Sequence, residues 1–106
     1  MKREERIARN EVLFREVNER VRDVHEGDRG GLNGFLCECG REDCTETVML
    51  TIAEYEDVRS DPRHFVVTPG HEIGEVERSI GRNDRYIVVE KHPTETATAL
   101  ETDPRI

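Results

Sequence analysis

The chain has 106 residues, of which 34% are hydrophobic and 38% are charged, and its formal net charge is -8. A single domain with so few apolar residues buries a small core, so a bound metal or a partner subunit would add needed stability. The acidic excess lies after residue 26. It argues against nucleic-acid binding, which requires clustered Lys and Arg, and favours a basic protein surface or a cationic ligand.

The sequence also bears on location. It contains no run of about 18 apolar residues, so we expect no transmembrane helix and no membrane partner. The N-terminal segment MKREERIARNEV lacks the apolar stretch of a secretory signal. We therefore expect a cytoplasmic protein, in which clustered cysteines act as metal ligands or reactive thiols rather than as disulfides.

Residues 3–26 are predicted to form one long helix that neither Gly nor Pro interrupts. Its apolar residues recur at heptad spacing: Ile7, Phe14, Val17, Val21 and Val24. Two interpretations follow from this pattern. The helix packs on the domain's own sheet, or it pairs with a partner protein or a second copy of the chain, with Asn10 setting the register.

Shorter elements are predicted after the helix. Residues 27–34 form a glycine-rich connector, which lacks the Lys-Ser/Thr of a phosphate-binding loop. Strands are predicted at residues 46–50, 64–68 and 85–91. Short helices are predicted at residues 51–62, where Thr51 and Glu54 match a capping box, and at residues 72–81.

These elements predict an α+β fold. A long N-terminal helix, a zinc-binding loop and two short helices accompany a small sheet of about three strands. Residues 1–92 would form one zinc-stabilised domain. Residues 93–106 are acidic, rich in Thr and without periodicity, and we expect them to form a flexible tail.

All three cysteines lie in the segment FLCECGREDC, as Cys37, Cys39 and Cys44. Zinc prefers four tetrahedral ligands drawn from thiolates and imidazoles. Gly40 allows the sharp turn that would let three closely spaced thiolates converge. The spacing therefore predicts a Zn²⁺ site. The alternative is a set of small buried residues with one reactive thiol.

The fourth ligand must come from another part of the chain. His71 follows a Pro-Gly turn at the end of the predicted strand 64–68, where its side chain can face the cysteine loop, and we favour it. The alternatives are His64, Asp43, Glu46 and water. His25 lies near the helix end, where a histidine interacts with the helix dipole for unrelated reasons, and His92 lies near the tail.

The chain also resembles a group of small actinobacterial proteins of unknown function. The resemblance covers about residues 9–91 and rests on three motifs in a fixed order: F-x-C-E-C-G-x3-C, F-V-V-x-P-G-H-E and D-R-Y-x-V-V-E-K. It implies that Cys37, Cys39, Cys44 and His71 belong to one shared pattern. It implies no activity.

Three functions are compatible with this pattern. A closed Cys3His site is structural, and Arg41 is placed to offset its charge, so we favour a non-enzymatic, zinc-stabilised module that binds a protein. The alternative is a thiol-based sensor that loses zinc on oxidation. The third is a zinc-dependent hydrolase, in which water is the fourth ligand and Glu72 acts as the base.

Overall fold

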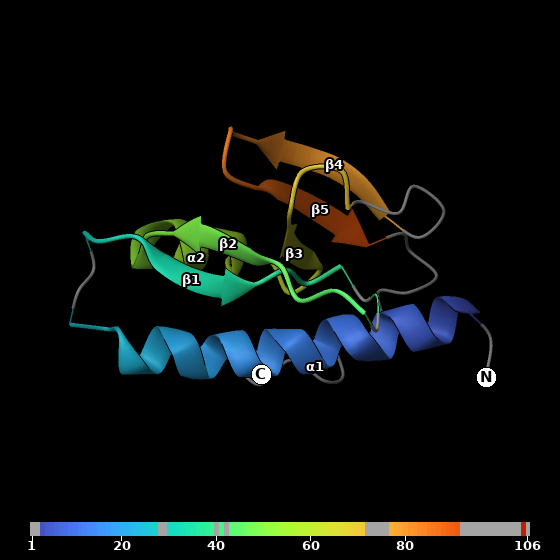
Figure 1. The fold of residues 1–106 in the computed structure, drawn as a ribbon, viewed down its shortest axis with the longest axis horizontal. Helices are drawn as coiled ribbons and strands as arrows, with labels where there is room; N and C mark the ends of the chain where they lie inside the picture. The colour runs from blue at the N-terminus through green and yellow to red at the C-terminus, as the bar shows by residue number, and fades with distance from the viewer. Residues whose placement is uncertain are drawn as a thin grey trace.

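The computed structural model describes residues 3–27, 30–39, 41, 43–71, 77–91 and 105. The fold is α+β, as the sequence predicts (Figure 1). In chain order the elements are α1 (Arg3–Val24), β1 (Asn33–Leu36), β2 (Thr47–Leu50), α2 (Ile52–Val58), β3 (His64–Val67), β4 (Glu77–Arg82) and β5 (Ile87–Lys91). Among these described residues, no helix is long and apolar enough to cross a membrane.

The strands form two antiparallel sheets. One is the hairpin β1-β2, and the other has the order β3-β5-β4. The three strands predicted from the sequence are therefore divided between the sheets, because β2 pairs with β1 while β3 pairs with β5. Strand β1 begins at Asn33, within the segment predicted to be a connector.

The predicted helix at residues 72–81 is wrong from residue 77 onward, because residues 77–82 form strand β4. Residues 72–76 lie outside the described part of the chain. The Oδ1 atom of Asn83 accepts hydrogen bonds from the backbone N–H groups of Arg85 and Tyr86. This turn joins β4 to β5 in a hairpin, and strand pairing overrides the helical spacing of the apolar residues.

The predicted capping box of α2 is present. The hydroxyl of Thr51 accepts from the backbone N–H of Glu54 at 3.1 Å, and the Glu54 carboxylate accepts from the backbone N–H of Thr51 at 2.9 Å. Ile52, Tyr55 and Val58 are buried on one side of the helix. Tyr55 stacks on Phe35 of β1, so α2 packs against β1.

Among the described residues, the apolar core has two parts. The first gathers residues of β1, β2 and α2 with two further residues: Phe35, Val48, Leu50, Ile52, Tyr55, Val58, Val66 and Tyr86. The second surrounds two of the cysteines: Cys37, Cys39, Phe65, Val67, Ile87 and Val89. Cys37 and Cys39 are therefore part of the core, and the half-buried Cys44 packs against it.

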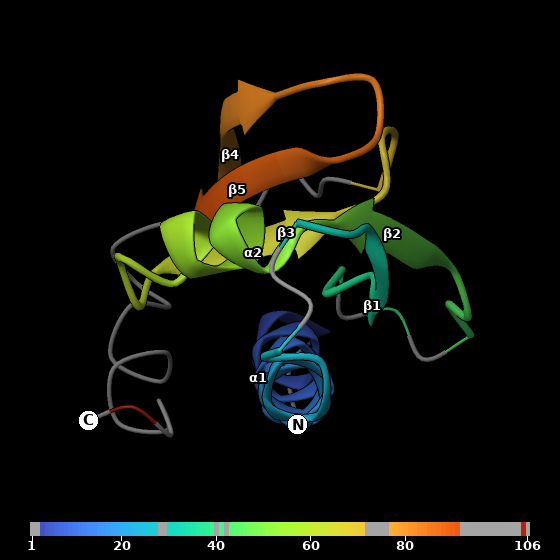
Figure 2. The ribbon, with the colours of Figure 1, turned by 90° about the vertical axis from the view of Figure 1, so that its left-hand side faces the viewer.

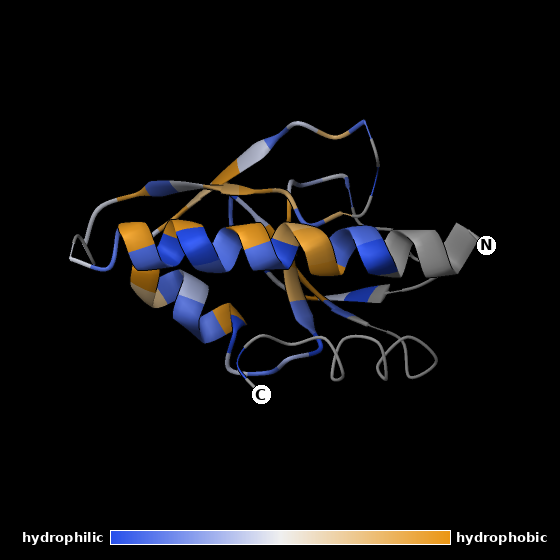
Figure 3. Ribbon diagram, turned by 90° about the horizontal axis from the view of Figure 1, so that it is seen from below, coloured by the Kyte–Doolittle hydropathy of each residue, from blue (hydrophilic) through white to orange (hydrophobic). Residues whose placement is uncertain are grey.

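Helix α1 lies on one side of the molecule, with both sheets and α2 on the other (Figure 2). The face that it buries is mostly polar, because Glu11, Arg15 and Asn18 are fully buried. Figure 3 views the molecule from the side of α1 and shows hydrophobic and hydrophilic residues in turn along the described part of the helix.

The interpretation in which α1 packs on its own domain is correct for Val21, which packs against the first core cluster. It is wrong for Val17 and Val24, which are 40% and 78% exposed. Arg15 shows why. Its guanidinium lies 4.7 Å from the centroid of the Phe65 ring and donates a hydrogen bond to the carbonyl of Pro62, so polar contacts orient the helix.

Candidate metal centre

The segment 37–39 joins the two sheets. The backbone N–H of Cys37 donates to the carbonyl of Glu46 at 3.0 Å, which extends the β1-β2 pairing by one step. The backbone N–H of Glu38 donates to the carbonyl of Val66 in β3 at 2.8 Å. The segment therefore leaves one sheet and lies along the edge of the other, which places Cys37 and Cys39 between them.

A tight turn after β3 brings His71 to the same place. Gly70 has a φ of 92°, and the backbone N–H of His71 donates to the carbonyl of Thr68 at 2.9 Å. These features fit a type II turn, in which Pro suits the second position and Gly the third. The Pro-Gly pair that the sequence singled out therefore reverses the chain and directs the His71 ring toward the cysteines.

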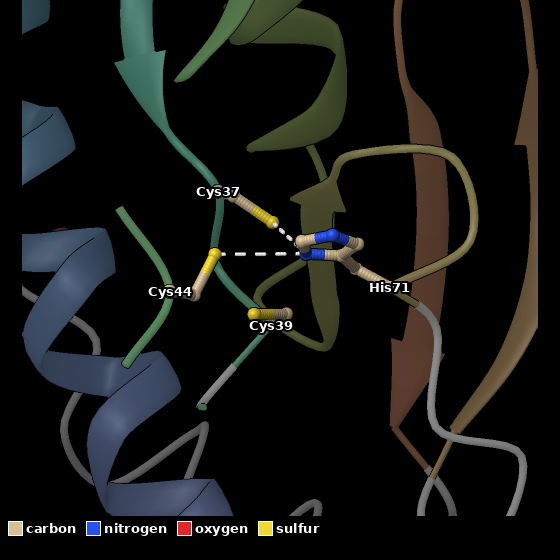
Figure 4. Close-up of side chains that lie close together, drawn as sticks. All are labelled: Cys37, Cys39, Cys44 and His71. Carbon is tan, nitrogen blue, oxygen red and sulfur yellow. Dashed lines mark hydrogen bonds between the residues drawn. The ribbon is translucent and has the colours of Figure 1, made fainter. Parts of the chain in front are cut away.

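The four side chains Cys37, Cys39, Cys44 and His71 gather around one small volume (Figure 4). Their ligand atoms all lie within 4.8 Å of one another. The Nδ1 atom of His71 is 3.6 Å from the Sγ atoms of both Cys37 and Cys44. A tetrahedral zinc ion with ordinary Zn–S and Zn–N bonds would separate a sulfur and a nitrogen ligand by about 3.6 Å. The spacing thus matches the chemistry of a zinc centre.

Neighbouring groups shift the pKa values of two of the cysteines. The neighbouring Cys39 thiol, and then the donors of Thr68, lower the pKa of Cys37 despite its burial. One of these donors is the backbone N–H of Thr68, which lies 3.1 Å from the Cys37 sulfur. The closeness of Cys37 raises the pKa of Cys39, and burial adds to it, because a second thiolate beside the first is costly without a cation. A divalent cation would remove that cost.

The alternative fourth ligands lie elsewhere or are exposed. His64 belongs to a second group with Asp61 and Glu90, and its Nε2 atom is 3.1 Å from Glu90 Oε2. Arginines already neutralise both carboxylates of that group, so we interpret it as an ion-pair network: Arg63 bonds Asp61, and Arg78 bonds Glu90.

The remaining candidates do not join the cysteine cluster within the described chain. Asp43 and Glu46 are exposed, as is His25 just beyond the end of α1. The other two residues of interest, Glu72 and His92, lie outside the described residues. Of the described histidines, only His71 shares a group with the cysteines.

Sequence reasoning missed two residues that hold the cysteine segment in place. Asn18 of α1 donates through Nδ2 to the Leu36 carbonyl at 2.9 Å and accepts through Oδ1 from the Leu36 N–H at 2.7 Å. It also donates to Glu38 Oε2 at 2.8 Å. The available signal was the row of polar residues at helical spacing that includes Arg15, Asn18 and Arg22.

Glu38 is the second missed residue. It lies between two cysteines and is fully buried. Its Oε1 atom accepts from the backbone N–H of Val66 at 2.9 Å, so the side chain pairs with β3 as a neighbouring strand would. Burial raises the pKa of this carboxyl to about 7, although the hydrogen bonds from Val66 and Asn18 oppose that shift. No local motif marks such a residue.

The fold and the site thus define a small α+β protein with a Cys3His cluster between two antiparallel sheets. Comparisons with protein-family models, curated proteins and solved structures found no match to this chain. The resemblance to actinobacterial proteins therefore stays a prediction.

Proposed function

We propose that the chain binds one zinc ion through Cys37, Cys39, Cys44 and His71, and that the ion stabilises a non-enzymatic module that binds another protein. One observation carries the proposal: four suitable ligand atoms from three separate segments lie within 4.8 Å of one another. Three sulfurs and one imidazole nitrogen form a soft donor set, which suits zinc better than calcium or magnesium.

A structural role follows from the donor set. Four protein ligands complete the tetrahedral shell of zinc and leave no position for water or substrate, whereas catalytic zinc sites keep one position open. Three thiolates also donate much negative charge, which weakens zinc as a Lewis acid. The hydrolase alternative would need water in place of His71, and His71 Nδ1 is already 3.6 Å from two of the sulfurs.

The first experiment measures zinc and the residues that hold it. Native mass spectrometry of the purified chain should show about one zinc ion per chain. Cys39→Ser should lower zinc affinity at least about tenfold and destabilise the fold, because structural zinc binding contributes directly to folding. His71→Ala should lower zinc affinity by a similar factor.

His25→Ala is the matched control, because His25 is exposed and lies outside the cluster. It should bind zinc as the parent chain does. A chain that folds fully without metal, or equal zinc affinities for His71→Ala and His25→Ala, would contradict the proposed site.

The partner surface that we propose is the outward face of α1. Leu13, Val17 and Val24 are exposed there by 54%, 40% and 78%. A helix that buries polar residues and exposes apolar ones gains stability when a partner protein or a second copy covers the exposed face. Light scattering over a range of concentrations distinguishes self-association from a monomer that needs another protein.

The Leu13→Ser/Val17→Ser double variant should abolish that association and keep its zinc, because neither side chain belongs to the metal cluster. A variant that associates as the parent does would show that this face is not the interface.

A second candidate function is a thiol-based sensor, and the exposure of Cys44 favours it. Cys37 and Cys39 are buried, whereas Cys44 is only half-buried. Hydrogen peroxide would take two electrons from the Cys44 thiolate to give a sulfenic acid and hydroxide. A second cysteine thiolate would then displace a second hydroxide to form a disulfide, and zinc would leave.

Peroxide titration with a zinc-sensitive dye tests the sensor. Micromolar peroxide should release zinc from the parent chain, and mass spectrometry should show the loss of two hydrogens. A site that keeps its zinc in millimolar peroxide is structural only, and the sensor function is then wrong.

A further inference from the structure

Arg105 occupies a slot between α1 and α2, formed by the carboxylates of Glu19 and Glu56. The guanidinium of Arg105 donates to both carboxylate oxygens of Glu19 in α1. Its Nη2 atom lies 2.9 Å from Oε2, and its Nε atom donates a hydrogen bond to Oε1. It also donates to both oxygens of Glu56 in α2, at 2.7 and 3.2 Å. One guanidinium thus engages four carboxylate oxygens on two elements.

The two carboxylates that form the walls of the slot, Glu19 and Glu56, also bond other arginines. The fully buried side chain of Arg59 donates through Nε to Glu19 at 3.0 Å. On the other wall, the Nε atom of Arg22 donates to Glu56. Both carboxylates are therefore oriented by arginines that belong to α1 and to the C-terminal end of α2, independently of the residue that fills the slot.

An aromatic ring and an open space complete the slot. The Arg105 guanidinium lies 5.9 Å from the centroid of the Tyr55 ring, within the range of a cation–π contact. Beside it is a cavity of about 330 Å³, lined by Glu19, Arg22, Asp23 and Arg105. The cavity gives another chain room to approach the slot.

The slot suits a guanidinium better than an ammonium. A guanidinium is planar and carries five N–H donors in a fixed fork, which matches two carboxylates at once, whereas an ammonium is a compact point charge. Burial alone would raise the pKa of Glu19, yet the hydrogen bonds from Arg105 and Arg59 lower it. Hydrogen bonding to Arg105 is also the main cause of the lowered pKa of Glu56.

We propose that Glu19, Glu56 and Tyr55 form a recognition site for an arginine side chain of a partner protein, and that Arg105 of the chain itself masks this site until the partner's arginine replaces it. The occupant is thus identified by chemistry, since the structure shows a guanidinium seated there. None of these residues belongs to the metal cluster, so the site does not use the proposed zinc ligands.

Arg105 can mask the site because it belongs to the same chain as Glu19 and Glu56. A tethered arginine competes at an effective concentration on the order of millimolar, so a partner arginine must bring further contacts to replace Arg105. Removing Arg105 therefore unmasks the site without altering its walls.

The test uses the full chain with Arg105→Ala and the synthetic peptide ETDPRI, which copies residues 101–106. Nuclear magnetic resonance titration should show saturable binding to Arg105→Ala, with shifts at Glu19, Tyr55 and Glu56. The parent chain should bind at least about tenfold more weakly, because its site is filled. The peptide ETDPKI should bind Arg105→Ala about tenfold more weakly than ETDPRI.

A second substitution tests the walls. Glu56→Gln in the Arg105→Ala background should lower peptide affinity about tenfold. Glu56 is preferred to Glu19 here, because Glu19 also accepts a hydrogen bond from the buried Arg59. Glu16→Gln, on an exposed part of α1, is the matched control and should bind as Arg105→Ala does.

Two results would overturn the proposal. Failure of ETDPRI to bind Arg105→Ala would show that the slot holds only its own tethered residue. Equal affinity for ETDPRI and ETDPKI would show general attraction between charges and no recognition of arginine.

Discussion

At the scale of single residues, two polar side chains make hydrogen bonds to the backbone that a neighbouring strand would otherwise make. Glu38 pairs with β3 through its own N–H and its carboxylate, and Asn18 bonds both the N–H and the carbonyl of Leu36. The bond between Val66 and the Glu38 carboxylate is buried and those of Asn18 to Leu36 are partly buried, so each unpaired group would cost free energy. The cysteine segment is therefore held on one side by β3 and on the other by α1.

Asn18→Ala should weaken both the fold and the metal site. The variant loses three hydrogen bonds, two to Leu36 and one to Glu38, and we expect the free energy of unfolding to fall by about 2–4 kcal/mol. Zinc affinity should fall about tenfold, as it does when a residue that supports metal ligands is lost. Urea denaturation and chelator competition measure the two effects.

Arg20→Ala, at an exposed position of α1, is the control and should change neither quantity. If Asn18→Ala loses stability while its zinc affinity stays at the parent value, Asn18 supports the helix alone.

Gly70→Ala should displace His71. The φ of 92° at Gly70 lies in the region that side chains with a Cβ avoid, so we expect a loss of about 1 kcal/mol or more and weaker zinc binding. Gly34→Ala is the comparison, because its new methyl group would meet only the Met49 sulfur at 3.8 Å. Equal zinc affinities for the two variants would show that the turn does not set the position of His71.

At the scale of elements, α2 is attached at its N-terminus through one carboxylate. Glu54 closes the capping box with Thr51 and accepts hydrogen bonds from Arg85, at 2.9 and 2.6 Å, in the turn before β5. The hydrogen bonds from Arg85 are the main cause of the lowered pKa of Glu54, which is about 2. A single side chain thus ties the first turn of α2 to the β4-β5 hairpin.

Glu54→Gln should therefore show a pH-dependent loss of stability. Because the pKa of Glu54 is lower in the folded chain, its ionised form stabilises the fold above the ordinary value of about 4.5, and that contribution disappears as the pH falls toward 2. With allowance for partial exposure, we expect a difference of roughly 2 kcal/mol between parent and variant at pH 7. Urea denaturation at several pH values measures it.

The difference between the two chains isolates Glu54, because any metal that acid releases would be lost from both of them. The difference should shrink steadily between pH 4.5 and pH 2. A difference that stays constant over this range would show that Glu54 acts through the capping box without its charge.

At the scale of the whole molecule, the Cys3His cluster brings together three separate segments of the chain. Cys37 follows β1, Cys44 precedes β2 and His71 follows β3, so a zinc ion would tie the two sheets together. The hydrogen bonds of Asn18 to Leu36 and Glu38 would then connect α1 to the same centre. Metal binding, sheet packing and helix attachment are thus expected to form one cooperative unit.

Removal of zinc should lower the stability of the entire fold. Each tenfold rise in free zinc above its dissociation constant should raise the free energy of unfolding by about 1.4 kcal/mol. Thermal melts in zinc buffers measure this slope. Hydrogen exchange should show that the amides of Glu38 and Val66 lose protection together with those of α1. A melting temperature independent of zinc would contradict this coupling.

The sequence by itself determined the features that depend on neighbouring residues. The capping box of α2, the Pro-Gly turn before His71 and the close spacing of the three cysteines are local, so short segments define them. Together they predicted an α+β fold and the meeting of His71 with the cysteines, which the structure shows. That these residues hold zinc stays a prediction.

Only the tertiary structure decided the features that depend on distant partners. Residues 77–82 form a strand because β5 is available to pair with them, and α1 turns its polar face inward because Leu36, Glu38 and Arg59 offer hydrogen bonds there. The seat of Arg105 likewise needs carboxylates from two helices. Pairing energies of this kind arise between segments far apart in the chain, so a local pattern such as the polar row of α1 does not show which partner it meets.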